Sequence, residues 1–330
     1  MSGVPVLEVR ELTKHFPGRR RLLRAAPAPL RAVQGVSFAV RRGQALGIVG
    51  ESGCGKSTLA KTIMRLIEPT SGQVLLDGRD TADIPRREFA RRVQFVFQDP
   101  YSSLNPRKTV RQTLEAPLRH LAGLDAPARR ARTAQLLDLV GLRPEFASRY
   151  PHEFSGGQRQ RVGIARALAT DAKVLLLDEP VSALDVSVQA QVLNLLRELQ
   201  TELGLTYVFI AHDLAVVENL CDEVAVMYLG RIVEQSPAAT LFAEPRHPYT
   251  HTLLSAVPTI GPGTGPRLRM AAPMDAAGPA GPAIGCAFAP RCYRATLRCQ
   301  DEPPALDAAL VGHPVACHHA DDTDPEDHAP

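Results

Sequence analysis

One short glycine-rich segment constrains this chain more than any other, and it has the sequence GESGCGKST over residues 50–58. It lies between a predicted buried strand, residues 44–49, and a segment with apolar residues at helical spacing, residues 58–67. Glycines adopt backbone angles that are closed to other residues, so successive N–H groups can point at a phosphate at the positive end of the helix. The segment therefore predicts the phosphate-binding loop of an α/β nucleotide-binding fold.

The residue types in this loop suit a nucleoside triphosphate and its magnesium ion. We expect Lys56 to reach the β- and γ-phosphates, Ser57 to ligate Mg²⁺, and Thr58 to support the α/β-phosphate region. A glycine-rich turn without a ligand is the other interpretation, and the strand and helix on either side argue against it. The remaining predicted ATP contacts come from the loop itself: Gly50, Ser52, Gly53, Cys54 and Gly55.

A pair of acids downstream predicts the hydrolytic half of the same site. Residues 174–177 are all apolar and lead directly into Asp178 and Glu179. That order is typical of a central parallel strand whose carboxyl end faces a ligand. We expect Asp178 to bind Mg²⁺ and Glu179 to polarise the attacking water. Two acids that only begin a helix are the other interpretation.

Composition sets broad limits on what this chain can be. Its 330 residues are 45% hydrophobic, which is enough for a packed core and for two domains. The net charge of +3 neither predicts nor excludes a nucleic-acid partner. No stretch approaches the roughly 18 uninterrupted apolar residues that a membrane span requires, and the first ten residues contain no apolar leader. We therefore expect a soluble cytosolic chain.

The pattern along the chain predicts a strand-rich core interrupted by helices. A helical subdomain is expected over about 99–169 and a long helix over 186–203. A basic, Pro/Ala-rich loop is expected over 17–30, Pro/Gly-rich linkers within 261–266 and 276–282, and an acidic tail over 321–330. Strands are expected at 6–9, 33–40, 74–76, 93–97, 174–177, 207–211 and 223–227.

The sequence FSGGQRQR over residues 154–161 resembles the signature motif of ATP-binding-cassette (ABC) ATPases. This resemblance covers about residues 5–257 and implies an α/β fold, a P-loop NTPase domain of the ABC type with an inserted helical subdomain and a small C-terminal extension. It also implies a nucleotide sandwich dimer, in which the signature residues complete the ATP site of the partner subunit. A capped surface helix is the other interpretation of the motif alone. The signature residues expected to act in this way are Ser155, Gly156, Gly157 and Gln158.

Four further positions match the ABC pattern. Gln98 corresponds to the glutamine that senses the γ-phosphate, the magnesium ion and the membrane partner. Asp185 lies in the loop that crosses the dimer interface, and it would otherwise be a helix cap. His212 corresponds to the switch histidine that contacts the γ-phosphate, and it would otherwise be a satisfied core residue. Phe16 is the candidate for stacking on adenine, although a core phenylalanine would fit the position equally well.

Two further segments, residues 99–106 and 245–258, resemble oligopeptide and dipeptide importer ATPases, and Gln158 with Arg159 resembles their F-type subunit. The resemblance implies an ATP-hydrolysing subunit that powers peptide import from the cytoplasmic face of the inner membrane. Its expected partners are a sister ABC ATPase, two transmembrane permease subunits and an extracytoplasmic peptide-binding protein, with no nucleic acid. The alternatives are an importer ATPase for nickel or another small solute, and a soluble ABC ATPase that does not serve transport.

Four of the six cysteines gather in the C-terminal region, residues 258–320. Soft thiolates clustered in a cytosolic chain favour a metal over disulfides. Their spacing fits neither a CxxC zinc site nor the usual ferredoxin run. The family resemblance adds a [4Fe–4S] cluster as one expected occupant, while zinc and unmetallated thiols remain the alternatives. The candidate ligands are Cys286, Cys292, Cys299 and Cys317.

Overall fold

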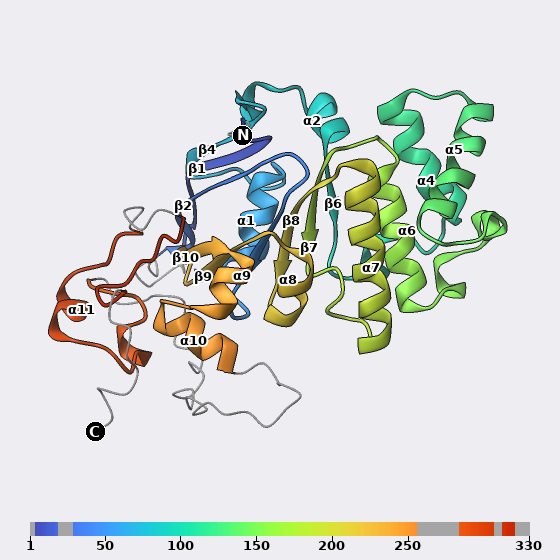
Figure 1. Cartoon of the computed structure of the whole chain (residues 1–330). Coiled ribbons are helices and arrows are strands. Elements are labelled where there is room, and N and C mark those ends of the chain that lie inside the picture. The colour runs from blue at the N-terminus through green and yellow to red at the C-terminus, as the bar shows by residue number, and fades with distance from the viewer. Residues whose placement is uncertain (1–3, 19–28, 256–283, 307–311, 321–330) are drawn as a thin grey trace, which may run out of the picture. The chain divides into compact units, whose positions relative to one another are not determined.

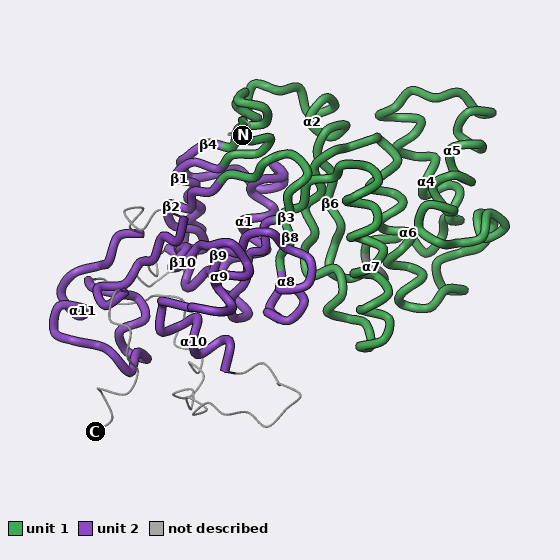
Figure 2. The backbone as a smooth tube through the Cα atoms, viewed as in Figure 1, with its two compact units in different colours: residues 1–8, 39–45, 74–210 green, residues 9–38, 46–73, 211–330 purple. Residues whose placement is uncertain are grey.

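The computed structural model describes residues 4–18, 29–255, 284–306 and 312–320 (Figure 1). The chain forms two compact units, each assembled from segments that are distant in the sequence (Figure 2). Unit 1 contains residues 1–8, 39–45 and 74–210, and unit 2 contains residues 9–38, 46–73 and 211–330. The predicted linkers, the acidic tail and residues 19–28 of the predicted basic loop lie outside the described residues.

Three parallel strands form the centre of unit 1. Strand β7 (Val174–Asp178) pairs in parallel with β6 (Val93–Val96) and with β8 (Thr206–Ala211). Every residue of β7 and β8 is buried, as expected for parallel strands that are covered on both faces. Because neighbouring parallel strands end at one edge of a sheet, the residues that follow β6 and β7 come close together.

Between β6 and β7 the chain is helical, and its helices begin at side-chain caps that the sequence supplies. Thr109 caps one helix and Asp125 caps another, where its carboxylate accepts a hydrogen bond from Ala128 N at 2.9 Å. The helices are α3 (Pro100–Ser103), α4 (Val110–Pro117), a π-helical turn (Leu118–Ala122), α5 (Ala126–Leu139) and α6 (Gly156–Leu168), with 3₁₀ turns at Pro144–Ser148 and Pro151–Glu153. After β7, helix α7 (Val186–Leu203) has the bounds that the sequence predicts.

Unit 2 is built around β9 (Glu223–Tyr228), which pairs in parallel with β3 (Ala45–Val49) and antiparallel with β10 (Arg231–Pro237). The loop after β3 leads into α1 (Lys56–Ile63), which is shorter than the predicted 58–67. The helix ends early because Arg65 takes a left-handed φ of 57° and Leu66 N donates back to Lys61 O at 2.9 Å. The other helices are α8 (Leu214–Leu220), α9 (Ala238–Ala243), α10 (Pro248–Ser255) and α11 (Leu297–Asp301), with a 3₁₀ turn at Ala289–Arg291.

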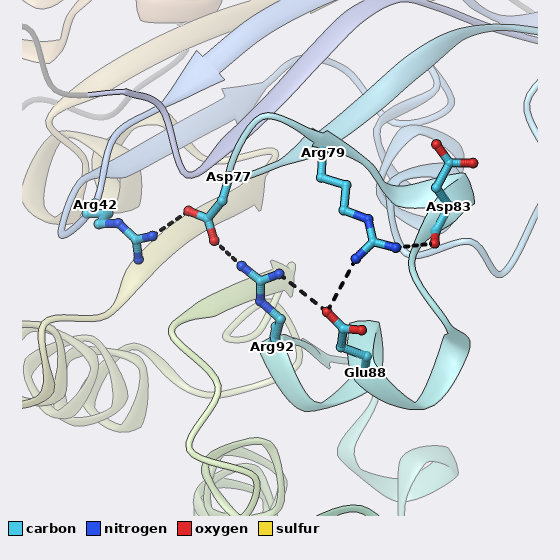
Figure 3. A network of polar contacts seen from close by, with 6 residues as sticks. All are labelled: Arg42, Asp77, Arg79, Asp83, Glu88 and Arg92. Atoms are coloured by element: carbon cyan, nitrogen blue, oxygen red, sulfur yellow. Dashed lines mark hydrogen bonds and ion pairs between the residues drawn. The ribbon is translucent and has the colours of Figure 1, made fainter.

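The strands β2, β1, β4 and β5 form a separate four-stranded sheet in that order. Its strands contribute residues to both units. Its strands are β1 (Leu7–Phe16), β2 (Leu30–Val40), β4 (Ser71–Leu76) and β5 (Arg79–Asp80). Within unit 1, the β4–β5 turn is linked to α2 (Arg86–Arg92), because Asp77 forms ion pairs with Arg42 and Arg92 (Figure 3). Partly exposed pairs of this kind each contribute about 1 kcal/mol or less.

No helix among the residues described is long and apolar enough to cross a membrane.

Candidate functional site

The glycines of the predicted phosphate loop have backbone conformations that favour glycine, and packing also requires glycine at two of them. Gly50, Gly53 and Gly55 have φ values of 154°, 82° and 110°, which side chains rarely allow. A Cβ atom on Gly50 would lie 2.1 Å from Met227 O, and one on Gly55 would lie 2.0 Å from Ala32 O. The loop thus passes against the backbone of unit 2 at two points, and only glycine fits there.

Lys56 is the first residue of α1, and its side chain lies against the phosphate loop. Its side chain is buried, and its Nζ donates to Gly50 O at 2.6 Å and to Glu51 O at 2.9 Å. The ammonium group is therefore held over the loop by carbonyl oxygens, which are the kind of acceptor that phosphate oxygens can replace. Ser57 and Thr58 lie half-buried in the first turn of α1, where the positive end of the helix dipole favours an anion.

The other two predicted loop contacts differ in exposure. Ser52 is exposed at the tip of the loop, whereas Cys54 is buried beneath it. Burial raises the pKa of the Cys54 thiol above its usual range, so the group is a neutral thiol at physiological pH. Cys54 therefore serves the loop as a small packing residue rather than as a nucleophile.

The two predicted acids lie in unit 1, at the carboxyl end of β7. Asp178 is the last residue of the strand and is 5% exposed. Glu179 follows with a left-handed φ of 45°, and its N–H donates to Ile210 O at 2.9 Å. A non-glycine residue in this conformation costs about 1–2 kcal/mol, and such residues cluster at functional sites.

Gln98, which the sequence predicts on separate grounds, contacts one of these acids. It follows β6, the strand beside β7, and its Nε2 donates to Glu179 Oε2 at 2.9 Å. The amide orients a carboxylate that the sequence predicts to activate water. The structure thus brings Gln98, Asp178 and Glu179 to one edge of three parallel strands.

The signature residues form a capped helix start in unit 1. Ser155 Oγ accepts from Gln158 N at 3.3 Å, and Ser155 N donates to Gln158 Oε1 at 3.1 Å, so the two residues cap each other. Gly156 and Gly157 begin α6, and a Cβ on Gly157 would lie 2.3 Å from Val188 Cγ1 of α7. These residues therefore have a local structural role, and their action on a partner's ATP stays a prediction.

The other interpretations of three predicted site residues were a helix cap for Asp185, a core histidine for His212 and a core phenylalanine for Phe16. Asp185 precedes α7, but its side chain makes no cap hydrogen bond. His212 follows β8 and is exposed, so it is not a core histidine. Phe16 is the last residue of β1 and is half-buried, with Lys14 Nζ 5.2 Å from its ring centre. Their predicted roles remain predictions.

The phosphate loop makes contacts with α10 and with the C-terminal region that the sequence does not predict. Glu51 N donates to Tyr249 Oη at 2.8 Å, and the Arg291 guanidinium donates to both oxygens of the Glu51 carboxylate, at 2.9 and 2.8 Å. Tyr249 lies in the segment 245–258 that the sequence marked out. Arg291 is 240 positions away from Glu51, and no local pattern indicates such a pairing.

The four C-terminal cysteines do not form the expected metal site. All four are free thiols, and Cys286 N donates to Cys299 O at 2.7 Å. Within the parts of the chain that the structure describes, no group of three or more His, Cys, Asp or Glu residues is arranged to hold a metal ion. Burial raises the pKa of Cys292 to about 11. The geometry fits neither the [4Fe–4S] cluster nor zinc.

Comparisons with known proteins give consistent matches. Residues 33–182 match the ABC transporter family, and residues 233–299 match the C-terminal region of oligopeptide/dipeptide transporters. The chain is 52% identical over 318 residues to a probable peptide ABC transporter ATP-binding protein of Sinorhizobium fredii, covering 95% of this chain and 89% of that one. It is 48% identical over 323 residues to the dipeptide transport ATP-binding protein DppF of Haemophilus influenzae, covering 97% and 98%.

Solved structures agree with these sequence matches. A dimeric ATP-binding cassette in a post-hydrolysis state, bound to ADP and Pi, superposes with a TM-score of 0.61 at 30% identity, covering 70% of this chain and 98% of that one. A cassette of Clostridium perfringens, part of the ABC transporter complex cbiONQ, superposes with a TM-score of 0.62 at 31% identity, covering 73% and 92%.

Proposed function

The chain belongs to the ATP-binding proteins of ABC transporters, in the group that carries the oligopeptide/dipeptide C-terminal region, and from this membership we propose that it hydrolyses ATP to power peptide import. The observation that carries the catalytic part is the 2.9 Å hydrogen bond from Gln98 Nε2 to Glu179 Oε2. Peptide as the solute is supported by the two relatives above, which are named for peptide and dipeptide transport.

The proposed mechanism assigns one task to each group. Lys56 and the loop N–H groups bind the phosphates, and Glu179 accepts a proton from the attacking water while Gln98 holds its carboxylate. His212 contacts the γ-phosphate, and Phe16 stacks on adenine. The hydroxyl of Ser57 and the carboxylate of Asp178 are oxygen ligands of the kind that Mg²⁺ prefers, and with Gln98 they would hold the ion, which neutralises phosphate charge when bound.

The partners of the chain form part of this proposal. Ser155, Gly156, Gly157, Gln158 and Asp185 act on the ATP of a sister ABC ATPase, as the dimeric state of one similar cassette supports. The cassette domain, residues 5–257 with its helical subdomain, docks on two permease subunits through residues 99–106, at the cytoplasmic face of the membrane. An extracytoplasmic peptide-binding protein delivers the solute, and residues 258–320 form the C-terminal region.

The direct test is ATP turnover of the complex in vesicles, with its permeases and binding protein, in the presence and absence of peptides. Turnover should rise with peptide, and Glu179→Gln should abolish the rise. Turnover that ignores every peptide but responds to another solute would reject peptide as the substrate. Turnover that is the same with and without the permeases would reject the transport role.

We assign no metal to the four cysteines, because the described residues offer no metal-binding group. Iron and zinc analysis of the chain purified without oxygen should therefore find well under one atom of either metal per chain. Stoichiometric iron with the visible absorption of an iron–sulfur cluster would overturn this assignment.

A further inference from the structure

The C-terminal region contacts the phosphate loop through one arginine with a largely covered side chain. Arg291 lies in the 3₁₀ turn Ala289–Arg291, and its guanidinium binds both oxygens of the Glu51 carboxylate, at 2.9 and 2.8 Å. The Arg291 side chain is 8% exposed, whereas that of Glu51 is 33% exposed. A bidentate, mostly buried pair of this kind fixes both orientation and charge, unlike an exposed surface pair.

An aromatic cluster holds Arg291 in place. The rings of Tyr228, Tyr249 and Phe288 lie with their centres 4.6 to 5.4 Å apart, and all three are almost fully buried. The Arg291 guanidinium lies 5.8 Å from the ring centre of Phe288 and 6.0 Å from that of Tyr228, in cation–π range. Because the rings come from β9, α10 and the C-terminal region, the arginine cannot move without disturbing unit 2.

The backbone of Glu51 is held as firmly as its side chain. Its N–H donates to Tyr249 Oη at 2.8 Å, and its carbonyl accepts from Lys56 Nζ at 2.9 Å. One residue of the loop is thus linked both to the C-terminal region and to the lysine that is proposed to bind phosphate. A change at Arg291 would reach Lys56 through this single residue.

The ion pair between Arg291 and Glu51 also changes the charge of the phosphate loop. A carboxylate in a loop that binds a polyanion opposes binding, because like charges repel. Arg291 neutralises that carboxylate. We propose that Arg291 is a positioning residue for ATP binding, which holds the phosphate loop and cancels the charge of Glu51, so that the C-terminal region sets the ATP affinity. This inference rests on the proposed function.

The test measures ATP binding to the full chain by displacement of a fluorescent ATP analogue, without hydrolysis. Arg291→Ala should weaken ATP binding about five- to tenfold, and Arg291→Lys, which keeps the charge but not the fork, should lose less. The Michaelis constant for ATP should rise with Arg291→Ala, while turnover at saturating ATP stays within about twofold of the wild type.

The decisive variant is Arg291→Ala combined with Glu51→Gln. If Arg291 acts by cancelling a charge, removing that charge should recover at least half of the lost affinity on a logarithmic scale. The matched control is Arg298→Ala, which breaks an exposed pair with Glu302 in the same region and should leave ATP binding unchanged.

Three results would overturn the inference. They are wild-type affinity in Arg291→Ala, a double variant as weak as Arg291→Ala alone, and an equal loss in Arg298→Ala. A wild-type chain that binds no ATP, or a Lys56→Ala chain that binds it normally, would instead reject the proposed function on which the inference rests.

Discussion

At the scale of single residues, Glu179 combines three features that ordinary surface acids lack. It follows a buried strand, it has a left-handed φ of 45°, and its carboxylate accepts a hydrogen bond from Gln98. A non-glycine residue in this conformation is strained, and such strain is found mainly at functional sites. These features suit a base that must be held in a fixed position.

Replacing this carboxylate should separate ATP binding from hydrolysis. Glu179→Gln keeps the size of the side chain and a hydrogen-bond partner for Gln98, but it removes the base. We expect ATP turnover to fall at least about a hundredfold while ATP affinity stays near that of the wild type. Glu198→Gln, at an exposed position on α7, is the matched control. Unchanged turnover in Glu179→Gln would mean that another group activates the water.

Two glycines of α6 make a matched test of packing. A Cβ on Gly157 would lie 2.3 Å from Val188 Cγ1, whereas a Cβ on Gly163 would meet nothing within 4 Å. Gly157→Ala should therefore lower the free energy of unfolding by about 1–3 kcal/mol. Gly163→Ala should leave it unchanged or raise it by about 0.5–1 kcal/mol, because alanine favours the helix. Equal melting temperatures for the two variants would contradict the close approach of α6 and α7.

At the scale of elements, β10 and α10 are joined by a buried carboxylate. Glu234 of β10 accepts from Arg246 N at 2.8 Å, from His247 N at 3.0 Å and from the Thr250 hydroxyl. His313 Nε2 also lies 2.7 Å from Glu234 Oε1. Burial raises the pKa of Glu234, but these hydrogen bonds outweigh burial and the pKa is lowered. Glu234 therefore stays charged and anchors the start of α10.

The same junction should make folding sensitive to mild acid. His247 is buried, and its Nδ1 accepts from Tyr249 N at 3.0 Å; burial lowers its pKa from 6.5 to about 4. In the unfolded chain His247 is protonated below about pH 6.5, whereas in the folded chain it is protonated only below about pH 4. This contribution to stability is thus complete above pH 6.5 and is lost as the pH falls to about 4. The loss should amount to roughly 3 kcal/mol.

Denaturant unfolding at several pH values tests this expectation. His247→Asn retains an acceptor for Tyr249 N but cannot take up a proton, so its stability should depend less on pH between 6.5 and 4. His120→Asn, at an exposed position, should leave the pH dependence of the wild type intact. The same pH slope in all three proteins would mean that His247 is not the titrating group.

The sequence predicts elements well where hydrophobic period and turn residues agree. Helix α7 has its predicted bounds because Gly204, with a φ of 61°, ends an amphipathic run. Helix α1 ends before the predicted position, because Arg65 adopts a left-handed conformation and Leu66 N donates to Lys61 O. The residue types at these positions do not predict such a turn. The helices α9 and α10 were not predicted, and the start of α10 is anchored by Glu234, a tertiary contact rather than a local pattern.

At the scale of the whole molecule, the predicted P-loop α/β fold of the ABC type is confirmed by the family matches and the similar solved cassettes. The sequence also predicts the loop at Lys56 and the acids at Asp178 and Glu179 as site residues, from short motifs with fixed spacing, and these roles stay predictions. It could not indicate that Arg291 binds Glu51, because folding alone brings these distant residues together. The metal expected at the cysteines finds no support among the described residues, since nearness in sequence did not produce a ligand geometry there.

Uptake of a labelled dipeptide tests the central claim most directly. Vesicles would carry the permeases, the sister ATPase and this chain on their inner face, with ATP inside and the binding protein outside. We predict that peptide accumulates with time only when ATP is present, and that Glu179→Gln abolishes accumulation while the complex stays assembled. ATP-dependent uptake of nickel ion without uptake of any peptide, or peptide uptake that survives Glu179→Gln, would contradict the account.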